Sequence, residues 1–255
     1  MADEKETILY RFYESIKNGG DVLTSQDLDI AINTLKIAEM KAKIKEKQIN
    51  IDNEKPKFEI VNGVLKRSFE NTEQIIVPDG VKIIGARAFR GCDRIQSIIL
   101  PSSVTEIGKY AFAYRHNLKS VYLPESIKVI HEYAFYHCKK LESVIIPVKV
   151  AYIANGTFED CVSLKNVVLP EDLTCIGSSA FRNCKKLQSF TIPQNVIRIE
   201  NSVFSGCVNL VNVNIPNGVQ TIENFAFSGC TKLKKPVIPP SVTEIGIGNF
   251  SNRGY

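Results

Sequence analysis

Hydrophobic positions recur along most of the chain with a period of 23 residues. The same residue types stand at fixed places in each period, as a proline (Pro78, Pro101, Pro124, Pro147, Pro170, Pro193, Pro216 and Pro239), an isoleucine six residues later (Ile84 to Ile245) and a phenylalanine eleven residues later (Phe89 to Phe250). No insertion or deletion interrupts this register. Such a period predicts a repeat architecture in which each unit stacks on its neighbours.

One unit reads roughly LxxVxLPxxVxxIGxxAFxxCxx. The LxxVxLP part alternates, which predicts a short strand that ends at proline, because proline cannot donate to a strand ladder. The VxxIG part predicts a turn, and the AFxxC part predicts one helical or 3₁₀ turn. One unit cannot bury its own apolar residues, so we expect stacked units, strands in a parallel sheet and a rod of roughly 40 Å for about eight coils.

This pattern resembles the BspA-type (Treponema-like) leucine-rich repeat over about residues 74–250. Residues 100–124 (LPSSVTEIGKYAFAYRHNLKSVYLP) and 215–233 (IPNGVQTIENFAFSGCTKL) carry the resemblance. It implies an α/β-type leucine-rich-repeat solenoid, a curved rod of short parallel strands that binds proteins or cell surfaces, with no catalytic residues. Arg115 departs from the pattern, since it stands where six other units have cysteine, and Pro236 stands where they have a core valine.

Three parts of the chain follow from this reading. Residues 1–56 predict a helical N-terminal segment of two helices, separated at Gly19-Gly20. Weak heptads in 26–49 fit either a homodimer contact or a helical hairpin that packs on the solenoid or on itself.

Residues 57–77 predict a capping β-hairpin, because Asn62-Gly63 is a type I′ turn signal, followed by the first strand. We expect the hairpin to cover the open edge of the repeat sheet. Residues 78–255 predict the solenoid itself.

Composition narrows the function classes. Hydrophobic residues make up 44%, charged residues 23%, and the net charge is +5. This mild charge makes nucleic acid an improbable partner, since clustered basic residues are expected for it. No apolar run suits a membrane helix and no signal peptide is recognisable, so we expect a cytoplasmic protein, or a surface or secreted one if a leader has been removed.

Candidate chemistry is sparse. Six of seven cysteines recur at one repeat position and predict a buried column of thiols, which fits a reducing compartment. His116, His131 and His137 are close in sequence but lie at different repeat positions, so a zinc site is a weak alternative and we expect no metal or cofactor. No GxSxG, GxxxxGK or GxGxxG sequence occurs, and no enzyme class is indicated.

Two surfaces are candidates for binding a partner protein. The first is an apolar stripe on the sheet, made of the strand residues that we expect to point outward: Ile76, Ile99, Tyr122, Ile145 and Val168. The second is an aromatic set that we expect beside it: Tyr110, Tyr114, Tyr133, Tyr136, His116 and His137. Nearby lysines and arginines, including Lys109, Arg115 and Lys119, predict a partner with an acidic and partly apolar surface.

The leading hypothesis is therefore a non-enzymatic scaffold that recognises a partner protein through the sheet face. A bacterial cell-surface adhesin is one alternative. The other is a cytoplasmic inhibitor or effector, encoded by a host or a phage, that occludes a nucleic-acid-handling enzyme.

Overall fold

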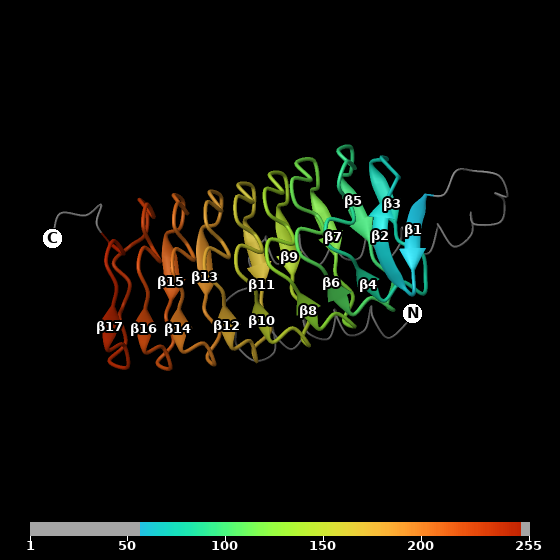
Figure 1. Ribbon diagram of the computed structural model, residues 1–255. Coiled ribbons are helices and arrows are strands. Elements are labelled where there is room, and N and C mark those ends of the chain that lie inside the picture. The colour runs from blue at the N-terminus through green and yellow to red at the C-terminus, as the bar shows by residue number, and fades with distance from the viewer. Residues whose placement is uncertain (1–56, 251–255) are drawn as a thin grey trace, which may run out of the picture. The chain divides into compact units, whose positions relative to one another are not determined.

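The computed structural model describes residues 57–250, which form a parallel β-solenoid (Figure 1). These residues fall in the second of two compact units, Met1–Lys55 and Pro56–Tyr255. The two predicted N-terminal helices and the predicted homodimer contact lie outside the described residues.

Seven coils contribute a three-residue strand from the LxxVxLP segment, as predicted, whereas the segment that contains Pro236 forms none. The strands pair parallel within three groups of neighbouring coils and are offset by one repeat, so that Ile75 lies opposite Ile98 and Ile98 opposite Val121. These strands form the first strand column: β3 (Gln74–Ile76), β5 (Ser97–Ile99), β7 (Ser120–Tyr122), β9 (Ser143–Ile145), β11 (Asn166–Val168), β13 (Ser189–Thr191) and β15 (Asn212–Asn214).

The VxxIG segment was predicted as a turn, and this is wrong. It forms a second, two-residue strand that ends at the repeat isoleucine, and these strands pair parallel within three groups of neighbouring coils. The second strand column comprises β4 (Ile83–Ile84), β6 (Glu106–Ile107), β8 (Val129–Ile130), β10 (Tyr152–Ile153), β12 (Cys175–Ile176), β14 (Arg198–Ile199), β16 (Thr221–Ile222) and β17 (Glu244–Ile245). Two residues are too few to show the alternation from which a strand is recognised in a sequence.

The predicted hairpin forms, with β1 (Phe58–Val61) antiparallel to β2 (Val64–Ser68). Asn62 and Gly63 have φ of 51° and 74°, which a type I′ turn requires. Its predicted position is wrong, however. β2 pairs with β4, so the hairpin extends the second strand column and not the LxxVxLP column.

Columns of identical side chains fill the core. The rings of successive repeat phenylalanines stack with centroids 4.7–6.0 Å apart from Phe89 to Phe250. Beside them, the Sγ of Cys161 donates to the carbonyl of Phe135 at 3.2 Å, and four other thiols repeat this contact at 3.1–3.3 Å. A small side chain with a weak donor therefore suits this position, because it fills the column and satisfies a buried carbonyl.

The AFxxC segment forms turns, and no helix is assigned within residues 57–250. At two positions of every coil the backbone is left-handed. The first is nine residues after the repeat proline (Arg87, Tyr110, Tyr133, Gly156, Ser179, Ser202, Phe225 and Gly248). The second is thirteen residues after it (Gly91, Tyr114, His137, Asp160, Asn183, Gly206 and Gly229). These turns make up the side of the rod on which the aromatic set lies.

Candidate functional site

The four tyrosines of the aromatic set come together on two adjacent coils. The rings of Tyr110 and Tyr133 stack at 5.0 Å with an interplanar angle of 8°. The ring of Tyr136 stands nearly perpendicular to Tyr133, at 85°, and to Tyr114, at 84°. This aromatic cluster is built on the two left-handed positions, which hold Tyr110, Tyr133 and Tyr114. The prediction that these residues lie together is confirmed.

Two histidines complete the cluster. The ring of His137 stacks on Tyr114 at 5.3 Å. Nδ1 of His116 is 3.0 Å from the carbonyl of His137, and because a carbonyl only accepts, this nitrogen is the donor. Nε2 of His137 lies 3.2 Å from Oδ2 of Asp160. Burial lowers the pKa of His137 despite the opposing effect of Asp160, so this imidazole is predominantly neutral at pH 7.

A groove of about 880 Å³ runs along the cluster. Its lining comprises Arg87, Arg90, Tyr110, Ala113, Tyr114, Arg115, Tyr133, Tyr136 and Glu159. The guanidinium of Arg87 lies over the Tyr110 ring at 5.4 Å, which fixes its position at one end. Within residues 57–250, neither Arg87 nor Arg90 has an ion-pair partner. This end of the groove therefore carries uncompensated positive charge.

The opposite end of the groove holds a carboxyl group whose charge is compensated. Glu159 is buried and pairs with Nη1 of Arg182 at 3.2 Å. Burial raises the pKa of Glu159, and the charge of Arg182 opposes that shift. The charge of the groove is therefore uneven. Within residues 57–250, Arg87 and Arg90 in the coil that begins at Pro78 lack an ion-pair partner, whereas Glu159 in the coil that begins at Pro147 is paired with Arg182.

Two tyrosine hydroxyls of the groove, those of Tyr133 and Tyr136, stay protonated at neutral pH. Burial raises the pKa of Tyr136 to about 12, and it also raises the pKa of Tyr133. Both hydroxyls therefore keep their proton over the physiological range, and that of Tyr136 is hydrogen-bonded to Tyr114.

The predicted apolar stripe is much less exposed than expected. Ile99 is buried at 4% exposure, Ile76, Tyr122 and Ile145 are half-buried, and Val168 is exposed at 37%. The in-register parallel pairing of Ile76 with Ile99 and of Ile99 with Tyr122 places like positions side by side, so that neighbouring side chains cover one another.

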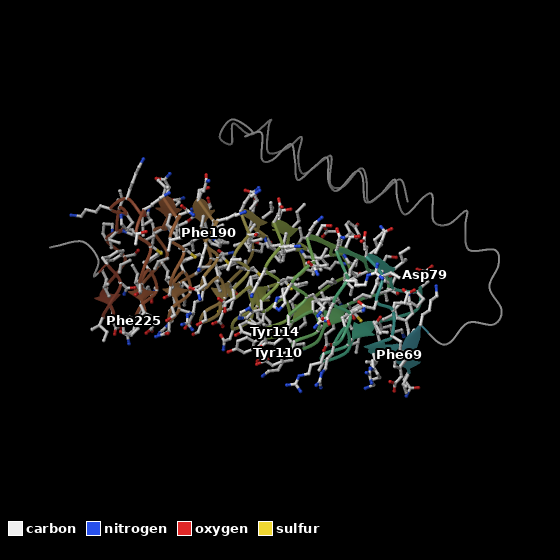
Figure 2. The ribbon with its side chains drawn as sticks, turned by 90° about the horizontal axis from the view of Figure 1, so that it is seen from above. Phe69, Asp79, Tyr110, Tyr114, Phe190 and Phe225 are labelled. Atoms are coloured by element: carbon white, nitrogen blue, oxygen red, sulfur yellow. The ribbon has the colours of Figure 1, made fainter. Side chains whose placement is uncertain are left out.

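The stripe and the aromatic cluster were expected side by side, and this is wrong. Figure 2 labels Tyr110 and Tyr114 along one edge of the rod and Phe190 of β13 along the other. The stripe lies on the first strand column, whereas Tyr110 and Tyr133 lie in the turns that follow the second strand column.

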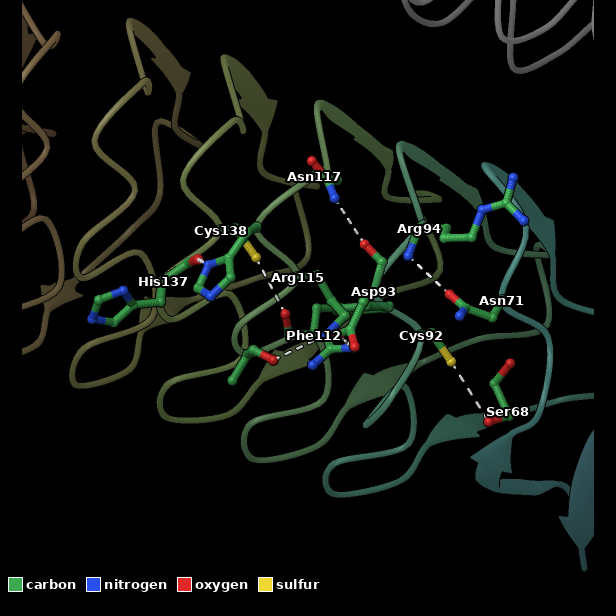
Figure 3. A network of polar contacts seen from close by, with 12 residues as sticks. Ser68, Asn71, Cys92, Asp93, Arg94, Phe112, Arg115, Asn117, His137 and Cys138 are labelled. Atoms are coloured by element: carbon green, nitrogen blue, oxygen red, sulfur yellow. Dashed lines mark hydrogen bonds and ion pairs between the residues drawn. The ribbon is translucent and has the colours of Figure 1, made fainter.

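The source of the positive charge also differs from the prediction. Lys109 pairs with Glu132 at 3.8 Å, and Arg115 is buried against Asp93 at 2.8 Å (Figure 3). Sequence reasoning missed Arg87 and Arg90, although a signal was present: Arg87 holds the same repeat position as Tyr110, and Arg90 the same position as Tyr136.

No group of three or more metal-binding side chains occurs within the described residues. His131 instead pairs with Glu106 at 2.9 Å. The part of the chain that the structure describes also contains no helix long and apolar enough to cross a membrane.

Comparison with known proteins agrees with this architecture. The family model of the BspA type leucine rich repeat region matches residues 59–187 and 152–254, in six copies. The chain belongs to the BspA-type leucine-rich repeat family. A T. pallidum leucine-rich repeat protein is similar at 31% identity and a TM-score of 0.65, over 72% of this chain and 92% of that one.

A leucine-rich repeat protein from Bacteroides ovatus is similar at 29% identity and a TM-score of 0.62, over 78% of this chain and 61% of that one. No curated protein matches the chain. Membership of this family of repeat proteins shows a solenoid scaffold, and it supplies no catalytic residues.

Proposed function

We propose that this chain is a non-enzymatic scaffold that binds a partner protein, and that the groove along the aromatic cluster is its main contact surface. One observation carries the proposal: aromatic side chains occupy left-handed backbone positions. Tyr110, Tyr114, Tyr133 and His137 have φ between 57° and 64°. A left-handed conformation costs a residue with a β-carbon roughly 1–2 kcal/mol, and bulky side chains rarely adopt it.

The other coils show that the fold does not require aromatic residues there. The position of Tyr110 and Tyr133 is taken by Ser179 and Ser202, and that of Tyr114 by Asn183 or by glycine. Glycine takes this conformation at little cost, and asparagine tolerates it better than tyrosine. Strain that the fold does not need is typical of functional surfaces.

The residue types also suit protein recognition. Tyr and Arg are enriched at interface hot spots because they bury a large area and form directed hydrogen bonds. The rings here are held by mutual stacking, as with Tyr110 and Tyr133, so little side-chain freedom is lost on binding. The sheet face, where Val168 is exposed, is the weaker candidate contact surface.

The test is affinity capture from lysate of the source organism, with and without nuclease. The groove variant is Tyr110→Ser/Tyr114→Asn/Tyr136→Ser, which installs residues that the chain already uses at Ser179, Asn183 and Ser205. The sheet-face variant is Tyr122→Glu/Ile145→Glu. We expect wild type and the sheet-face variant to retain a partner that the groove variant loses. Loss with the sheet-face variant alone would move the contact surface to the first strand column.

A further inference from the structure

We infer that the groove takes an extended acidic peptide segment of the partner, in which carboxylate side chains are followed or preceded, about three residues away, by an apolar residue. This inference rests on the proposed function. It adds the chemistry of the bound segment, the spacing of its residues and the coil at which its acidic residues lie.

The acidic character of the segment follows from Arg87 and Arg90. Both lack an ion-pair partner within residues 57–250, and Arg87 is held in place by the Tyr110 ring. A guanidinium presents a planar fork of donors that matches a carboxylate bidentately. At the other end Glu159 is paired with Arg182, and within the described residues the groove offers no unpaired cation there, so the acidic residues of the peptide are oriented toward the coil that begins at Pro78.

The spacing follows from the repeat. Arg87 and Arg90 lie in one coil, and Tyr133 and Tyr136 lie two coils further along. Strands of neighbouring coils are about 4.8 Å apart, which places the arginines and these tyrosines about 10 Å from each other along the rod. An extended peptide advances about 3.3 Å per residue, so it covers that distance in about three residues.

The packing of the rings favours a peptide over a single-stranded nucleic acid. Base binding needs open aromatic faces on which bases stack. Here Arg87 covers one face of Tyr110 and Tyr133 covers the other, while the remaining face of Tyr133 lies against Gly156. Tyr110 and Tyr133 therefore offer ring edges and hydroxyl groups to the groove, which suit an apolar side chain and the backbone carbonyls of a peptide.

The experiment uses the full chain, fluorescently labelled, on an array of 12-residue peptides. Each peptide carries a Glu-Glu pair and one leucine, phenylalanine or proline in a Gly-Ser background. The separation runs from one to eight residues in both orders. Affinities of the best peptides are then measured by fluorescence anisotropy. We expect binding to peak at a separation of about three residues.

Two charge-matched variants decide the role of the arginines. The Arg87→Gln/Arg90→Gln variant should bind the best peptide with an affinity lower by about ten-fold or more, because two charge-assisted contacts are lost. The control, Lys185→Gln/Lys186→Gln, removes the same charge from exposed residues outside the groove and should leave the affinity within about two-fold.

Several outcomes would overturn the inference: no peptide binding, binding that is independent of the separation, equal loss in both variants, or tighter binding of a single-stranded oligonucleotide. The proposed function fails separately. If the arginine variant still captures the partner that the groove variant loses, protein binding through the aromatic cluster stands and the acidic-segment inference fails.

Discussion

Nη1 of Arg115 lies 2.8 Å from Oδ1 of Asp93, and within residues 57–250 this is the one coil in which a guanidinium replaces a thiol of the core column. The Arg115 side chain is 7% exposed and Asp93 is 75% exposed, so the pair links the buried column to the surface (Figure 3). Nε of Arg115 also donates to the carbonyl of Ala113 at 3.2 Å. A charged group thus occupies a site that the fold elsewhere fills with cysteine.

Arg115→Cys should restore the thiol column with little loss of stability. The new thiol would lie near the carbonyl of Phe89, by analogy with Cys138 and Phe112 in the next coil. Replacement of a buried charged pair by a well-packed side chain is often neutral or stabilising, so we expect the free energy of unfolding to change by less than about 1 kcal/mol. Urea denaturation under reducing conditions measures this change.

Arg115→Ala is the matched control, because it removes the same charge but leaves the column unfilled. It should be less stable than Arg115→Cys by about 1–2 kcal/mol. Equal stability of the two variants would show that the column does not depend on the thiol.

Gly156→Ala should destabilise the chain and displace Tyr133. Gly156 has φ of 60°, and a β-carbon there would overlap Cδ1 and Cε1 of the Tyr133 ring. Gly91→Ala is the control, since Gly91 has φ of 88° and an added β-carbon meets nothing within 4 Å. Both variants place alanine in a left-handed conformation and are destabilised by it. A further loss of about 1 kcal/mol in the free energy of unfolding of Gly156→Ala would therefore measure the overlap with the Tyr133 ring.

The double variant Tyr133→Ser/Gly156→Ala tests the cause of that loss. Removal of the Tyr133 ring should abolish the extra destabilisation caused by Gly156→Ala. A double-mutant cycle, which compares the double variant with the two single variants, measures this coupling. A Gly156→Ala variant no less stable than Gly91→Ala, measured by urea denaturation, would contradict the contact.

The sequence predicted the repeat, the first strand column and the core columns well, because these depend on apolar side chains that recur in phase. It could not predict the left-handed positions. They hold Arg87, Tyr110, Ser179 and Phe225, and no glycine marks them consistently. The groove was missed for the same reason, since only those turns bring Arg87 against Tyr110. The exposure of Ile99 depends on its lateral neighbours, which strand alternation alone does not reveal.

Phe158→Ala should cost about 3–5 kcal/mol in the free energy of unfolding. The Phe158 ring is fully buried and stacks between Phe135 and Phe181, at 5.4 and 5.6 Å. Phe225→Ser is the control, because Phe225 is 42% exposed and serine occupies its repeat position in two other coils, so we expect a loss of less than about 1 kcal/mol. Similar losses in the two variants, measured by chemical denaturation, would argue against a continuous phenylalanine core.

The buried thiols should make the chain less stable at alkaline pH. Burial raises the pKa of Cys138 from its ordinary value of 9.0 to about 12, and it raises the pKa values of Cys161, Cys184 and Cys207 as well. The unfolded chain then ionises first as the pH rises. Ionisation of these thiols therefore leaves the free energy of unfolding unchanged below pH 9, and it lowers that free energy progressively as the pH rises toward 12.

Comparison of wild type with Cys138→Ala isolates one thiol from the lysines and tyrosines that titrate in the same range. Between pH 7 and pH 10, wild type should lose about 1.4 kcal/mol more stability than the variant, because one thiol that ionises only in the unfolded state contributes about this amount. The measurement is urea denaturation with reductant at both pH values. Equal losses would mean that Cys138 reaches solvent and ionises in the folded chain, which its hydrogen bond to Phe112 in a fully buried column argues against.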